Sequence, residues 1–76
     1  MKKVLEEFLT RYGEKKYTQY ELNDLKNDLV IELTNYKKEA KGVDVVLVSK
    51  LIPKVQKQKT KEDLFMLVTE TIFQDN

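Results

Sequence analysis

The chain has 76 residues, and its 14 basic and 13 acidic side chains leave a formal net charge of only +1. A chain this short buries only about 60% of the surface that it exposes when unfolded, which excludes a second hydrophobic core, so we expect a single helical domain over residues 1–76. The balanced charge excludes a global field that would select nucleic acid or acidic surfaces, so any such preference must be local.

Neither cysteine nor histidine occurs in the sequence. Their absence removes disulfides, the thiol nucleophile, the commonest general base and the strongest ligands for soft metals. There is also no G-x-S-x-G element and no glycine-rich phosphate loop. We therefore expect a protein that is not an enzyme and that uses no cofactor, metal or small-molecule substrate. A chain without cysteine fits a reducing compartment, and we expect a cytoplasmic protein.

The first segment has apolar residues at helical spacing, and they stop at a glycine. This pattern predicts a helix over residues 2–12 that Gly13 terminates. Glu6 and Glu7 interrupt the apolar run that an export signal needs, so we expect the segment to stay with the mature chain. The apolar positions are Val4, Leu5, Phe8, Leu9 and Tyr12.

The second segment opens with a capping box and continues as a narrow apolar stripe. The hydroxyl of Thr18 can accept a hydrogen bond from the amide three residues later, and the carboxylate of Glu21 can return to the amide of Thr18. Together with the stripe, this signal predicts a helix over residues 18–41 that ends at Gly42. The stripe consists of Leu22, Leu25, Leu29, Leu33, Tyr36 and Ala40.

The third segment is ambiguous between strand and helix. Residues 43–52 contain four valines, which favour a strand by propensity, whereas the spacing of Val45, Val48 and Val55 makes a helical face. A lone strand would have no partner in an otherwise helical chain, so we predict a helix over 44–57. Pro53 either kinks this helix or opens a second short piece. Pairing of residues 43–52 as a strand across a dimer stays open.

The fourth segment begins after Thr60, a favourable N-cap residue. Glu62 and Asp63 follow in the first turn, where the helix dipole favours negative charge, and the pattern predicts a helix over 61–74. Its apolar run, residues 64–68, is the longest in the chain and is far short of the roughly 18 to 20 residues of a membrane span. We therefore expect no transmembrane segment.

These four helices with short connections indicate an all-α fold. The two arrangements in which such stripes cover one another are a small antiparallel four-helix bundle and a compact orthogonal array of helices. The carboxylates of Glu21, Asp24 and Asp28 share one face of the second helix, but they lack the loop geometry of calcium sites, so we interpret them as a solvated surface.

The fourth helix carries more apolar surface than a core of this size needs. This excess favours a protein that acts by binding another protein, either a different chain or a second copy of itself. The residues that we expect at the contact are Phe65, Met66 and Phe73, with Tyr36 as a neighbour. Accessory or regulatory proteins of bacterial or phage type act in this way, by occupancy without chemistry.

A lysine-rich stretch without acids, residues 50–61, supports an alternative function. It contains Lys54, Lys57, Lys59 and Lys61, which could neutralise phosphates in a helix-turn-helix-like arrangement. Against nucleic-acid binding, the helix that would read the bases begins Glu62-Asp63 and continues with apolar residues, which do not match base edges. A solvated lysine loop is the competing interpretation.

The segments LTNYKKEAKG (33–42) and VVLVSKL (45–51) resemble the middle of the immunity proteins for pediocin-like bacteriocins. In that family, a long charged helix closes at a Lys/Gly turn, and the next helix begins with an aliphatic run that ends in Ser, a basic residue and Leu or Met. The resemblance implies a small cytoplasmic four-helix bundle that protects the producer cell by acting with a membrane receptor. It covers about a quarter of the chain. The sequence lacks the longer N- and C-terminal extensions typical of that family, in which the C-terminal part determines specificity.

Overall fold

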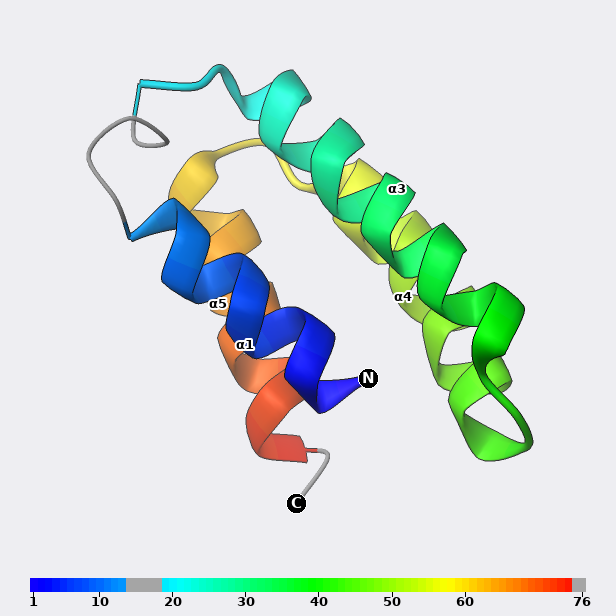
Figure 1. The fold of residues 1–76 in the computed structure, drawn as a ribbon. Coiled ribbons are helices and arrows are strands. Elements are labelled where there is room, and N and C mark those ends of the chain that lie inside the picture. Colours follow the sequence, from blue (N-terminus) through cyan, green and yellow to red (C-terminus); the bar gives the residue numbers. More distant parts are fainter. Residues whose placement is uncertain (14–18, 75–76) are drawn as a thin grey trace.

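The protein is described by a computed structural model that covers residues 1–13 and 19–74. These residues form four helices and no strand: α1 (Lys2–Tyr12), α3 (Leu22–Glu39), α4 (Val43–Lys57) and α5 (Lys61–Gln74). Successive helices run in opposite directions, and the closest-packed pairs are α3 with α4 and α1 with α5 (Figure 1). The predicted all-α class is confirmed, and the arrangement is a small antiparallel bundle.

One hydrophobic core lies between the four helices, because each helix turns a single apolar stripe inward. On α3 the stripe is Leu25, Leu29 and Leu33, spaced four residues apart as the sequence predicts. The other helices supply Leu5, Phe8 and Tyr12, then Val48, Leu51 and Val55, and finally Leu64 and Val68. No polar or charged residue is buried among the described residues, so the stability of the core is apolar in origin.

Helix α3 is shorter at both ends than the predicted range 18–41. It begins at Leu22, with Glu21 in an extended conformation and no side-chain cap, and Thr18 lies outside the described residues. The physical reason is packing: Gln19, Tyr20 and Glu21 are exposed, so another helical turn at this end would add little apolar burial. At the other end α3 stops at Glu39, and Gly42 makes the turn with a φ of 65°, in the left-handed region that suits glycine.

The third segment is a continuous helix, which resolves the ambiguity of residues 43–52. Val48, Leu51 and Val55 are buried, as the helical face predicts. Pro53 lies inside α4 on its exposed side and does not divide it. The antiparallel packing of α4 on α3 supplies the burial that overrides the strand propensity of the valines.

The ends of α1 and α5 match their predicted positions. Thr60 caps α5 as expected, because its Oγ1 accepts a hydrogen bond from the amide of Asp63 at 3.0 Å. Gly13 follows α1 but keeps a right-handed conformation, φ −72° and ψ −14°, so this end needs no left-handed glycine. Over residues 1–13 and 19–74, none of the helices combines the length and apolar character that crossing a bilayer requires.

Candidate functional site

The outer face of α5 carries two exposed apolar side chains. Met66 is 60% exposed and Phe73 is 69% exposed. Because they are seven residues apart, they lie on the same side of the helix, about 10 Å apart along its axis. The buried residues Leu64 and Val68 mark the opposite side. Exposed acids surround the apolar pair: Glu62, Asp63 and Glu70.

Phe65 does not belong to this face, so the expectation that it is exposed beside Met66 and Phe73 is wrong. It is half-buried against the core, with its ring centroid 6.3 Å from that of Phe8 and 6.5 Å from that of Tyr12. One residue turns an α-helix by about 100°, which carries Phe65 from the outer face to the flank that packs on α1.

Tyr36 is also placed elsewhere than predicted. Its hydroxyl oxygen accepts a hydrogen bond from the Met1 ammonium at 2.6 Å, and the hydroxyl donates one to Oδ2 of Asp44 at 2.6 Å. The ammonium lies 3.8 Å from the same carboxylate oxygen. The charged groups of α1 and α4 therefore hold the tip of Tyr36 between three helices, and its side chain does not join Met66 and Phe73.

Polar contacts also bridge α1 and α3 further along. The hydroxyl of Tyr12 donates a hydrogen bond to Oδ2 of Asp28 at 2.8 Å, and the guanidinium of Arg11 pairs with Glu32. Burial raises the pKa of the Tyr12 phenol well above its ordinary value, and the hydrogen bond and charge of Asp28 raise it further. Tyr12 therefore stays protonated and acts as a donor that joins the two helices.

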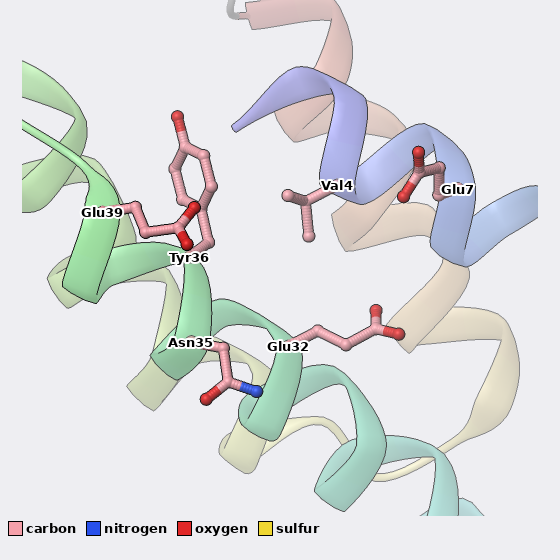
Figure 2. A pocket seen from close by; sticks show the side chains of 6 residues that line it. All are labelled: Val4, Glu7, Glu32, Asn35, Tyr36 and Glu39. Carbon is pink, nitrogen blue, oxygen red and sulfur yellow. The ribbon is translucent and has the colours of Figure 1, made fainter.

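An open pocket of about 300 Å³ lies beside these contacts, between α1 and α3. Figure 2 shows Val4 and Glu7 on α1 facing the side chains of α3 across this pocket. The α3 side supplies Glu32, Asn35, Tyr36 and Glu39. Although three carboxylates line it, the described residues contain no group of three or more such side chains that could hold a metal ion.

The predicted lysine site is spread over two helices and their connection. Lys54 and Lys57 are exposed on the last turns of α4, Lys59 is exposed in the connection, and Lys61 begins α5 and is half-buried. Glu62 follows Lys61 directly, so acids border the basic surface on α5. Nucleic-acid binding by these lysines stays a prediction.

Separate shallow hollows lie along the side of the bundle that α4 and α5 form, and we call this side the α4/α5 groove. In Figure 1 these two helices lie behind α3 and α1. Sequence reasoning missed this groove, because helical periodicity identifies exposed positions but not which helices are neighbours. The available signal was the spacing of Leu47, Lys50, Leu51 and Lys54 at positions i, i+3, i+4 and i+7, which places them on one side of a helix. One hollow is lined on α4 by Leu47, Lys50, Leu51 and Lys54, with Met1, Thr71 and Gln74 completing it, and another is lined by Asp63, Met66, Leu67 and Glu70 of α5 together with Gln58. We call Lys50 and Lys54 the basic rim of the groove and Asp63 and Glu70 its acidic rim.

Comparisons with protein-family models, curated proteins and solved structures find no match for this chain. The resemblance of residues 33–51 to bacteriocin immunity proteins therefore stays a prediction. The surfaces described above are the basis on which a function can be inferred.

Proposed function

We propose that this protein acts without catalysis, by binding another protein through the outer face of α5. The observation that carries the proposal is the exposure of Met66 and Phe73 on one side of that helix. Exposed apolar side chains that share one face of a helix can anchor an interaction site, and Met and Phe are enriched in the cores of protein interfaces.

The geometry of the pair supports this proposal. Two apolar side chains separated by two helical turns match the spacing with which a helix docks in a partner's groove. The phenyl ring and the flexible thioether supply area that adapts to a partner. The exposed acid Glu62 would contribute to the polar rim of such a contact.

Site-specific crosslinking in cells of the source organism tests the proposal. A photo-crosslinking phenylalanine analogue replaces Phe73 in one variant and Ile31 in another, because Ile31 is also an exposed apolar residue, at 57%, but lies on α3. We expect a crosslinked species that contains a different protein with the analogue at position 73 and not at position 31.

A second substitution makes the test stricter. Met66→Ser, added to the variant with the analogue at position 73, should reduce the crosslinked species, because it removes the other apolar contact of the same face. Identical products from positions 73 and 31, or no product from either, would contradict the proposal.

Immunity to a pediocin-like bacteriocin is a second candidate function, and one feature favours it. The resembling residues 33–51 form the end of α3, the turn at Gly42 and the start of α4, which is the local arrangement that the resemblance implies. Expression in sensitive bacteria should then raise their tolerance to at least one member of a panel of such bacteriocins. Unchanged tolerance across the panel would remove this candidate.

A further inference from the structure

The two rims of the α4/α5 groove carry opposite charges. Lys50 and Lys54 are exposed one turn apart on α4, and Asp63 and Glu70 are exposed two turns apart on α5. None of the ion pairs between described residues involves these four side chains. Four charged side chains and the leucines between them are therefore available to a molecule that binds in the groove.

This charge pattern discriminates between occupants. A partner segment of a single charge sign would be attracted by one rim and repelled by the other. A second copy carries the same two rims, and a two-fold axis along the groove brings its basic rim onto the acidic rim of the first copy, and the reverse. We propose that a second copy of this chain covers the groove, so that the protein is a symmetric dimer through α4 and α5.

The helix directions suit such a dimer. Within one chain α4 and α5 are antiparallel (Figure 1). A two-fold axis along the groove preserves helix direction, so α4 of one copy would lie antiparallel on α5 of the other and repeat the arrangement inside each chain. The contact would cover the partly exposed Leu47 and Leu67 of both copies.

The molecule has enough surface for this contact. A stable interface of ordinary size buries about 800 Å² on each partner. That is less than a fifth of the 5233 Å² surface of the chain, an area that one side of a four-helix bundle supplies. The dimer goes beyond the proposed binding of another protein, since it uses the groove and leaves Phe73 on the outer face of α5.

Sedimentation equilibrium over micromolar to millimolar concentrations tests the proposal with charge reversals. One variant has an entirely acidic groove, Lys50→Glu with Lys54→Glu, and the other an entirely basic groove, Asp63→Lys with Glu70→Lys. The unaltered protein should dimerise. Each variant alone should dimerise roughly tenfold more weakly or worse, because like charges then meet at both contacts.

The equimolar mixture of the two variants is the decisive sample. Each acidic rim of one variant then meets a basic rim of the other, so the mixture should form a heterodimer close in strength to the unaltered dimer. Circular dichroism on the same samples checks that both variants are helical, and recovery in the mixture shows that neither had lost its fold.

A matched control keeps the same change in net charge away from the groove. Lys37→Glu with Lys41→Glu alters two exposed lysines near the end of α3 and should leave dimerisation unchanged. A protein that stays monomeric at all concentrations, variants that dimerise like the unaltered chain, or a mixture that does not associate would each overturn the dimer. The variant Lys50→Glu with Lys54→Glu changes no residue of the outer face of α5, so its result can be separated from that of the crosslinking test.

Discussion

The α1/α3 side and the α4/α5 side of the bundle are built differently. Between α1 and α3, hydrogen bonds and an ion pair join charged or polar groups across the helices, at Tyr12 with Asp28 and at Arg11 with Glu32. Between α4 and α5, the side-chain hydrogen bonds of Gln58 and Thr60 are local, to the carbonyl of Lys54 and from the amide of Asp63, and do not bridge the two helices. Both sides cover the same apolar core.

This difference indicates which surface of the protein is available for binding a partner. Polar groups that are paired within the chain contribute to folding, and their hydrogen bonds to each other leave few donors and acceptors for a partner. Charges that border an apolar groove without internal ion pairs contribute little to folding and are available for recognition. The following experiments measure how far this contrast holds, using variants studied at concentrations where the protein is monomeric.

The largest effect is expected in the core that both sides share. Leu29→Ala removes a fully buried side chain of α3 and should lower the free energy of unfolding by about 2 to 5 kcal/mol, through lost burial and a cavity. Ile31→Ala, two residues further on the exposed side, should change it by less than about 0.5 kcal/mol. Urea titration followed by circular dichroism measures both, and equal effects would show that α3 is not packed as described.

The α1/α3 side should be sensitive to loss of one hydroxyl. Tyr12→Phe keeps the buried ring and removes the donor to Asp28, which should lower the free energy of unfolding by about 1.5 to 3 kcal/mol, because a half-buried carboxylate loses a partner. The same urea titration measures it. A loss below about 0.5 kcal/mol would mean that water replaces Tyr12 at no cost and that the two sides do not differ in this respect.

The contribution of the Tyr12 hydroxyl to stability should also depend on pH in the alkaline range. The pKa of the Tyr12 phenol is raised on folding, so its contribution is complete below the ordinary value near 10 and is lost as the pH rises further, since only the unfolded chain then releases the proton. The stability difference between the unaltered protein and Tyr12→Phe should therefore narrow from about pH 10 upward. Thermal unfolding between pH 8 and about pH 11.5 tests this, and a constant difference would contradict it.

A smaller effect is expected at the connection that joins α4 to α5. Thr60→Ala removes the cap of α5 and should lower the free energy of unfolding by about 1 kcal/mol. Thr34→Ala, at an exposed position inside α3, is the control and should be neutral or slightly stabilising, because alanine is the better helix former. Equal changes in the two variants would show that the Thr60 hydroxyl does not support α5.

The smallest effects are expected at the rims of the groove. Lys54→Gln and Glu70→Gln should each change the free energy of unfolding of the monomer by less than about 0.5 kcal/mol, because both side chains are exposed and outside any ion pair of the described residues. A loss of more than about 1 kcal/mol in either variant would show that the rims stabilise the single chain, and the contrast between the two sides would fail.

Local signals predicted the helices where several of them agreed. The N-cap Thr60, the acids of the first turn and the apolar run coincide, and the predicted range of α5 is correct. The capping box predicted at Thr18 includes a residue outside the described ones, its turn contains no buried residue among positions 19–21, and α3 begins at Leu22. A capping pattern therefore marks a helix start only where packing continues through that turn.

The surfaces were harder to predict than the helices. Residues 64–68 are apolar around most of the helix, so the sequence does not indicate whether Phe65 or Met66 faces the core, and the rings of Phe8 and Tyr12 decide this. The placement of Tyr36 depends on groups from three helices that meet at one end of the bundle. Such contacts between distant segments have no periodicity that a single sequence reveals.

The aromatic rings packed around Tyr12 give the protein a spectroscopic signal that depends on its tertiary packing. There is no tryptophan in the sequence, and the ring centroid of Tyr12 lies 4.2 Å from that of Phe8 and 6.5 Å from those of Phe65 and Tyr20. Near-ultraviolet circular dichroism arises from rings held in a fixed asymmetric setting, whereas the far-ultraviolet signal follows the helices. The near-ultraviolet signal of this protein should therefore report loosening at one end of α1 while the helices themselves persist.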